Sequence, residues 1–233
     1  MAVVRRTALE PERHVLHLPY LWRAALAAAV LVVSAVIAKQ GVPRWEESIF
    51  RAIYQLPDWL SAVLWLPMQL GTLWAPFIVG GCAWLAWRRW RPAVGAVVMG
   101  LVAWWAAKLV KNAVGRGRPA NVLTDFTLRT GAPREGLGFL SGHCAVAFCL
   151  ATVLSPYLTP RKRIVAFALA VVVAVARIET GAHLPLDTVG GAAMGCLLGW
   201  IWHMIVGVPE SVAHHGWVTP GRRPRVGASE GSI

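Results

Sequence analysis

The sequence predicts an all-α protein, a polytopic membrane bundle of six transmembrane helices. Of its 233 residues, 57% are hydrophobic and only 15% are charged, which lies outside the composition of ordinary soluble domains. The apolar residues gather in long uncharged runs, as bilayer-spanning helices require. Basic residues cluster between these runs and at the termini, where cytoplasmic loops and anionic headgroups account for them.

Six apolar runs are the candidate spans. The fifth is the shortest, and a crossing there requires Arg163 and Arg177 to extend toward the headgroups at its ends. The second contains Pro67, Gly71 and Pro76, so we expect an interfacial segment before the crossing. The runs cover residues 21–38, 60–87, 92–110, 144–158, 164–176 and 188–208.

The basic clusters set the expected orientation. With the N-terminus inside, the clusters at 88–91, 161–163 and 222–225 all become cytoplasmic. Residues 1–20 are then a cytoplasmic N-terminal segment, residues 21–208 the membrane domain, and residues 209–233 a cytoplasmic tail expected to be disordered. Residues 40–59 are expected to form an external amphipathic helix. The first run also resembles a signal sequence, and an uncleaved signal anchor is preferred because the run is long enough to span.

Composition also argues against other classes of protein. The net charge of +12 is carried by short clusters at predicted membrane boundaries, and no nucleic-acid-reading module is present, so nucleic acid is not an expected partner. The cysteines lie in apolar runs without metal-ligand spacing and are expected to be small buried hydrophobes. They are Cys82, Cys144, Cys149 and Cys196. We expect no metal and no cofactor.

Three polar clusters stand at the ends of apolar runs, and counting the helices places all three on the external side. The first lies in residues 111–119 and opens an external loop, 111–142, that carries part of the site. The second opens the fourth run, and the third joins the fifth run to the sixth. Their candidate functional residues are Lys111, Arg118, Ser141, Gly142, His143, Arg177, His183 and Asp187.

These residue types suit phosphoryl transfer. Arginine offers a planar fork of donors and lysine a compact positive charge, while a serine and a glycine amide at a helix start complete an anion cradle. Such groups stabilise a phosphoryl transition state without a metal. His183 and Asp187 are four residues apart, so on a helix they share one face, and the carboxylate can fix the imidazole tautomer for nucleophilic attack. His143 is then free for proton transfer.

The three clusters read KxxxxxxRP, SGH and RxxxxxHxxxD in this order. This combination resembles the signature of the type 2 phosphatidic acid phosphatase superfamily, in its integral membrane branch. Two departures stand beside it: Leu140 occupies the position before SGH where the family usually has proline, and Ala176 the position before Arg177 where it usually has serine. The second departure removes one hydrogen bond to phosphate.

The resemblance implies a mechanism and a substrate class. His183 attacks phosphorus to form a phosphohistidine, assisted by Asp187, and His143 protonates the leaving oxygen and then activates water. The remaining five candidates bind the phosphate, and no metal takes part. Family members act on phosphatidic acid, phosphatidylglycerol phosphate, and isoprenyl phosphates and diphosphates. The implied partners are therefore a lipid phosphate or diphosphate and the surrounding membrane lipids.

Other interpretations of the same residues stay open. Taken singly, Lys111 and Arg118 are typical of headgroup anchors, and only their combination with the other clusters favours catalysis. A phosphotransferase on the same scaffold has the same sequence pattern as a hydrolase. An anion transporter is less favoured, because the chain lacks repeated halves. No pattern assigns a role to the other external charged residues, which are Arg116, Asp125, Arg129, Arg134, Glu135 and Glu179.

Overall fold

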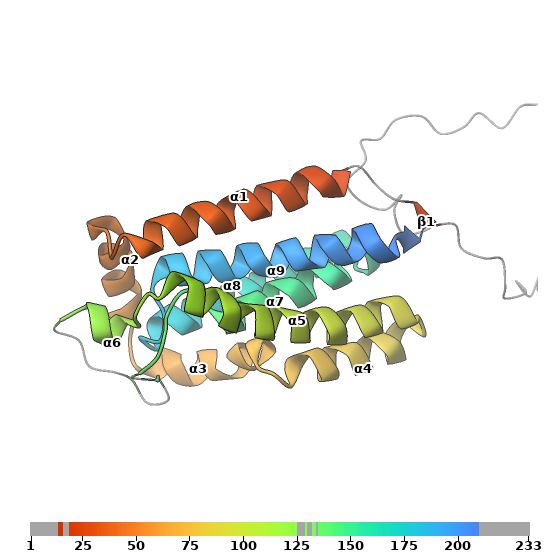
Figure 1. Cartoon of the computed structure of the whole chain (residues 1–233). Coiled ribbons are helices and arrows are strands. Elements are labelled where there is room, and N and C mark those ends of the chain that lie inside the picture. The colour runs from red at the N-terminus through yellow and green to blue at the C-terminus, as the bar shows by residue number, and fades with distance from the viewer. Residues whose placement is uncertain (1–13, 16–18, 125–128, 130–131, 134, 210–233) are drawn as a thin grey trace, which may run out of the picture.

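The structure is a computed structural model, and it describes residues 14–15, 19–124, 129, 132–133 and 135–209. These residues form an all-helical bundle whose longer helices lie side by side (Figure 1). The helices are α1 (Pro19–Lys39), α2 (Arg44–Tyr54), α3 (Trp59–Met68), α4 (Ala75–Trp87), α5 (Trp90–Val114), α6 (Pro119–Val122), α7 (Gly142–Leu154), α8 (Pro160–Glu179) and α9 (Pro185–Val206), with 3-10 turns η1 (Gln69–Gly71) and η2 (Ser155–Tyr157). Two short strands, β1 (His14–Val15) and β2 (Val208–Pro209), pair antiparallel and place both ends of the described chain together.

Helix length and composition support three or four membrane spans. Within the described ranges, α1, α5 and α9 are long and apolar enough to cross a bilayer, and the bent pair of α3 and α4 makes a fourth span if it is counted as one. The apolar stretch Gly142–Tyr157 is shorter than a full span, and α8 begins with the basic residues of cluster 161–163. The structure therefore supports a helical membrane domain, while the count of six stays a prediction.

Helix α7 lies at the centre of the bundle, which accounts for its short length. It packs against α5, α8 and α9, and most of its residues are buried. Its 13 residues rise about 20 Å, less than the hydrocarbon thickness of about 30 Å. A helix enclosed by its neighbours presents little surface to lipid, so its length need not match the bilayer.

The second apolar run, for which we expected an interfacial segment before the crossing, is broken into two helices. Helices α3 and α4 are separated by η1 and bend by 73°. Pro67 lies inside α3 and Pro76 in the first turn of α4, and both lack the amide hydrogen that a continuous helix needs. At the break, a Cβ on Gly71 would lie 2.6 Å from the Cβ of His143. The interruption therefore brings backbone directly against the second polar cluster.

Segment 40–59 contains the expected amphipathic helix, α2. In α2, Glu46 and Phe50 are buried while Trp45 and Ile49 are exposed. The helix lies across the end of the bundle opposite the described termini (Figure 1). Its buried face therefore covers the end of the bundle at which the three polar clusters are expected.

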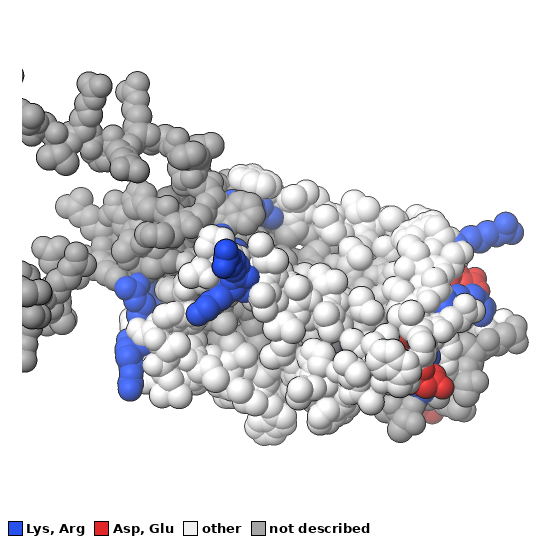
Figure 2. Space-filling model, turned by 180° about the vertical axis from the view of Figure 1, so that it is seen from behind, with Lys and Arg blue, Asp and Glu red and all other residues white. Residues whose placement is uncertain are grey.

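Charged side chains are distributed as a bilayer would require. On the face shown in Figure 2, Lys, Arg, Asp and Glu gather mainly toward the two ends, and the broad middle is uncharged. The exposed side chains of the helices include many large hydrophobics, such as Val32, Leu85, Leu109 and Ile164. In a membrane protein such an apolar surface faces the acyl chains.

A row of glycines sets the distance between α9 and α7. Gly191, Gly195 and Gly199 are four residues apart and therefore share one face of α9. A Cβ on Gly191 would lie 2.4 Å from the carbonyl oxygen of Ser141, and one on Gly195 would lie 2.3 Å from that of Ala145. Small residues of this kind let membrane helices approach to backbone contact. The third polar cluster, which opens α9, is thereby held against the second, which opens α7.

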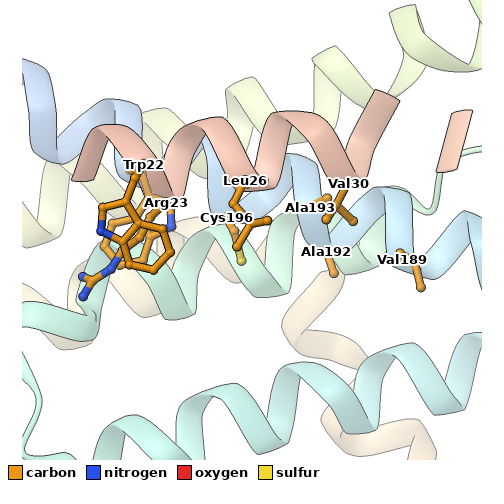
Figure 3. A pocket seen from close by; sticks show the side chains of 10 residues that line it. Trp22, Arg23, Leu26, Val30, Val189, Ala192, Ala193 and Cys196 are labelled. Carbon is orange, nitrogen blue, oxygen red and sulfur yellow. The ribbon is translucent and has the colours of Figure 1, made fainter. Parts of the chain in front are cut away.

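A groove runs along the contact between α1 and α9 (Figure 3). Its volume is about 380 Å³, and its lining is almost wholly apolar, with Trp22 and Arg23 toward one end and Val30 and Val189 toward the other. Trp200 also lines it, with its ring 5.3 Å from the guanidinium of Arg23. No residue of the three polar clusters lines it. The groove is thus separate from the predicted site.

We predict that Gly195→Ala destabilises the protein by about 1–3 kcal/mol, because the added methyl group overpacks the contact between α7 and α9. Gly81→Ala is the matched control, since it is also helical but has no atom within 4 Å of the added Cβ. Thermal unfolding in detergent measures both. Equal unfolding midpoints for the two variants would show that the contact between α7 and α9 does not restrict the size of the side chain at position 195.

Candidate active site

The third cluster forms a tight turn between α8 and α9. Arg177 lies in the last turn of α8, and its carbonyl oxygen accepts hydrogen bonds from the amides of Ala182 and His183, at 3.2 and 3.1 Å. Gly181 has a φ of +75°, a conformation that favours glycine. This turn holds His183 almost fully buried, with 3% of its surface exposed.

His183 and Asp187 are paired as expected, but not because they share a helical face. His183 precedes α9, which begins at Pro185. Asp187 is the third residue of that helix, and its Oδ2 folds back to accept the amide hydrogen of Leu184 at 3.0 Å, as a capping-box carboxylate does. The same Oδ2 lies 3.3 Å from Nδ1 of His183. With Nδ1 as the donor, Nε2 carries the free lone pair.

The second cluster opens α7 and is bonded to the third. Ser141 is the N-cap residue, and its hydroxyl accepts the amide hydrogen of Cys144 at 3.5 Å. Its own amide donates to the carbonyl oxygen of Asp187 at 2.8 Å. Gly142 begins the helix, and His143 follows with its ring centroid 6.0 Å from that of Trp104. His143 is only partly buried, in contrast to His183.

The first cluster connects the loop that follows α5 to the other two clusters. Lys111 lies in the last turn of α5, and its Nζ donates to the carbonyl oxygens of Leu137 and Gly138, at 3.0 and 2.8 Å. Arg118 donates from Nε to the carbonyl oxygen of Glu135 at 2.9 Å, and from Nη1 to that of Ala182 at 3.0 Å. Arg118 therefore reaches the residue next to His183.

Arg177 is buried but makes few hydrogen bonds. It is 6% exposed, and its Nη1 lies 3.4 Å from Sδ of Met68, a weak acceptor. Its Nε has no hydrogen-bond partner among the described residues. Because buried donors are normally satisfied, this guanidinium is suited to an anionic ligand.

The structure brings all eight predicted residues to one end of the bundle. Electrostatic interactions connect His143 with Arg177, His183, Lys111 and Arg118, and the hydrogen bonds above join Ser141 to Asp187. Gly142 is fixed between Ser141 and His143. The result is a cluster of three cations around two imidazoles, which can bind a phosphate and transfer it.

Two further buried residues belong to this cluster and were missed by the sequence analysis. Arg116 is 6% exposed and bonds Asp187, while Glu46 is fully buried and pairs with Arg116. A signal for Glu46 was present: it shares the inner face of α2 with Phe50, four residues on, and an acid on a buried helical face requires a partner. Arg116 carried no such signal, because its partners are about 70 positions away in sequence.

The remaining charged residues, to which the sequence assigned no role, differ in burial and in their partners. Glu179 is buried and accepts a hydrogen bond from Ser61 at 2.6 Å, and it also pairs with Arg129. Glu135 is exposed. Asp125 and Arg134 lie outside the described residues. In the described part of the chain, no group of three or more His, Cys, Asp or Glu side chains could hold a metal ion.

Burial lowers the pKa of His183 well below its usual 6.5, and the positive charges of Lys111, Arg177 and Arg118 act in the same direction. The imidazole is therefore neutral at physiological pH. A neutral imidazole with its lone pair on Nε2 is the form that can act as a nucleophile.

Comparisons with known proteins match the same region. The profile of the PAP2 superfamily matches residues 92–209, just over half of the 233-residue chain. A lipid A 1-phosphatase of Rhizobium johnstonii is 35% identical over 120 residues, which is 48% of this chain and 48% of that protein. Phosphatidylglycerophosphatase B of Bacillus subtilis is 26% identical over 200 residues, which is 78% of this chain and 92% of that protein. The chain thus spans about half the length of the first relative and most of the second.

Two crystal structures share the fold. One is a transmembrane PAP2-type phosphatidylglycerolphosphate phosphatase from Bacillus subtilis, with a TM-score of 0.65 and 22% identity, covering 79% of this chain and 96% of that one. The other is Aquifex aeolicus LpxE, with a TM-score of 0.57 and 27% identity, covering 66% of this chain and 92% of that one.

We predict a specific dependence of stability on pH. Because the pKa of His183 is lower in the folded state than the unfolded value of 6.5, the unfolded state binds more protons below pH 6.5, and wild-type stability falls as the pH drops. The loss attributable to His183 is up to about 1.4 kcal/mol per pH unit. As the pH falls from 7 to 5, the unfolding free energy of wild type should therefore decrease by more than that of His183→Asn. A difference that stays constant over this range would contradict the lowered pKa.

Proposed function

This chain belongs to the PAP2 superfamily, and from that premise we propose that it is a membrane lipid phosphatase. The proposed reaction is hydrolysis of a phospholipid phosphomonoester or an isoprenyl phosphate or diphosphate on the external face of the membrane. The observation that carries the proposal is the buried His183, paired through Nδ1 with Asp187 and surrounded by three cations. The family membership that the three motifs predicted is confirmed.

In the proposed reaction, Nε2 of His183 attacks phosphorus while Nδ1 donates its hydrogen bond to Asp187. A bond forms between nitrogen and phosphorus, and the bond between phosphorus and the lipid oxygen breaks. The negative charge of the bound phosphate favours the protonated form of His143, which gives its proton to that oxygen, so the dephosphorylated lipid leaves. His143 then takes a proton from water, which attacks the phosphohistidine, releases phosphate and restores His183.

The cations supply the binding energy and the transition-state stabilisation. Arg177 has a donor without a partner among the described residues, so it can bond phosphate without breaking an existing hydrogen bond. Lys111 and Arg118 are held in place by backbone carbonyls and contribute fixed positive charge. The hydroxyl of Ser141 and the amide of Gly142 at the start of α7 complete the cradle. No step requires a metal ion.

A lipid substrate is supported by the location of the site. The motif residues lie at the end of the bundle covered by α2 (Figure 1). The middle of the face shown in Figure 2 is uncharged, so an amphiphile in the bilayer can present its headgroup to the cations. The similar proteins described above are phosphatases whose names specify lipid substrates. The basic residues of clusters 88–91 and 161–163 support placing the opposite end, with both termini, in the cytoplasm.

The test is phosphate release by purified protein in detergent with EDTA present. Phosphatidic acid, phosphatidylglycerol phosphate and undecaprenyl diphosphate are the substrates to compare. We expect release by wild type that survives chelation, and none above background for His183→Ala. Lys111→Ala should reduce kcat roughly a hundredfold to a thousandfold, the usual effect of removing one transition-state donor.

Lys108→Ala is the matched control for Lys111→Ala. Lys108 lies one turn earlier on α5, is exposed, and rests on the ring of Trp105 at 4.1 Å. The activity of Lys108→Ala should equal that of wild type. Phosphoryl transfer to an added acceptor alcohol, without release of free phosphate, would identify a transferase, and full activity of His183→Ala would overturn the proposed nucleophile.

A further inference from the structure

Glu46 is a fully buried carboxylate contributed by α2, a helix outside the three motifs. Its Oε1 accepts the amide hydrogen of Leu186 at 2.8 Å and a hydrogen from Nη1 of Arg116 at 3.1 Å. Its Oε2 pairs with Nη2 of Arg116. The two ends of this contact are 70 positions apart in the sequence. Glu46 therefore binds both an arginine of the first cluster region and the first turn of α9.

Arg116 connects this contact to the catalytic pair. Its Nη1 also donates to Oδ1 of Asp187 at 3.1 Å, and its Nη2 donates to the carbonyl oxygen of Gly41 at 3.2 Å. Asp187 then uses Oδ1 for Arg116 and Oδ2 for His183. The guanidinium thus fixes the rotation of the carboxylate that orients the imidazole.

The charges of the three groups explain why Arg116 needs a second carboxylate. A buried arginine facing Asp187 alone would neutralise it, and little negative charge would remain to stabilise the cationic ring of a phosphohistidine. Glu46 and Asp187 share one guanidinium, so the formal charges of the three groups leave one negative charge in excess. Oδ1 of Asp187 bonds Arg116, while Oδ2 faces His183. In a buried site such an interaction is screened little.

We propose that Glu46 and Arg116 are positioning residues for the His183–Asp187 pair, through which the external helix α2 sets the orientation and charge of the nucleophile. This inference rests on the proposed function for its kinetic consequences. Neither residue need touch the substrate. It follows that α2 contributes to catalysis through Glu46 and does not only shield the site from solvent.

The central experiment compares Glu46→Gln with Glu47→Gln. The first substitution keeps the shape of the side chain but removes its charge, while Glu47 is the neighbouring acid, half-exposed and paired with Arg51 on the same helix at 2.7 Å. We expect Glu46→Gln to lower kcat roughly tenfold to a hundredfold, as the loss of an orienting partner does, with little change in KM, because the phosphate-binding cations are intact. Glu47→Gln should match wild type in both constants.

A second readout does not depend on activity. In protein labelled with nitrogen-15 histidine, the proton on Nδ1 of His183 should give a downfield signal that is absent in His183→Asn. We expect this signal to weaken or shift in Glu46→Gln and to stay unchanged in Glu47→Gln. If Glu46→Gln does not fold, Glu46→Asp, which keeps the charge but retracts it by one methylene, takes its place and should show the same changes to a smaller extent.

The outcomes separate the two proposals. A wild type that releases no phosphate from any lipid counts against the proposed function, and the histidine signal still tests the positioning role. An active wild type, together with a folded Glu46→Gln of unchanged kcat and unchanged His183 signal, would overturn the positioning role alone. A rise in KM with kcat unchanged would also overturn it, because it would place Glu46 in substrate binding.

Discussion

The close approach of α9 to α7 is the constraint on which the rest of the site depends. Gly191 and Gly195 let the two backbones meet, and the amide of Ser141 then bonds the carbonyl oxygen of Asp187 directly. Helix α7 begins with the second motif and α9 begins just after His183, so this single contact sets the distance between the two motifs. The loop from α5 reaches the same place, because Arg118 bonds the turn that carries His183.

The electrostatics of the site follow from this convergence. Lys111, Arg118 and Arg177 all interact with His143 and His183, so the site concentrates like charge in a buried setting. A phosphate dianion offsets this charge, and a transition state with more charge on its oxygens offsets it further. On the other side of His183 the sign is reversed, because Glu46 and Asp187 share Arg116. The imidazole of His183 therefore lies between a cluster of cations and a pair of carboxylates.

Much of this arrangement could be predicted from the sequence. Polar clusters at the ends of apolar runs, with the helices counted in order, predicted that eight residues would meet at one end, and the structure brings them there. Pro67, Gly71 and Pro76 marked the break in the second run. The membrane count was less predictable, because α7 is enclosed by its neighbours and can therefore be short. The pairing of His183 with Asp187 was expected from spacing, but it arises from a capping carboxylate and not from a shared helical face.

The support beneath His183 could not be predicted from the sequence. Glu46 lies in segment 40–59, for which the sequence predicted only an amphipathic helix, and its contact with Arg116 joins segments whose spacing follows no local period. Such long-range pairs become visible only when the fold is known. Leu140 and Ala176, the two departures from the family pattern, are both fully buried. Leu140 packs in the main hydrophobic core, so the position before SGH is filled by an apolar side chain that contributes to packing.

The central claim, that His183 carries the phosphoryl group, is tested most directly by trapping the intermediate. Wild-type protein would be mixed with a lipid radiolabelled in its phosphate, quenched in alkali within milliseconds, digested and analysed by mass spectrometry. The account predicts a label that is stable in alkali, labile in acid, and attached to the peptide that contains His183. A label on another residue, or rapid phosphate release with no labelled peptide at any time, would contradict it.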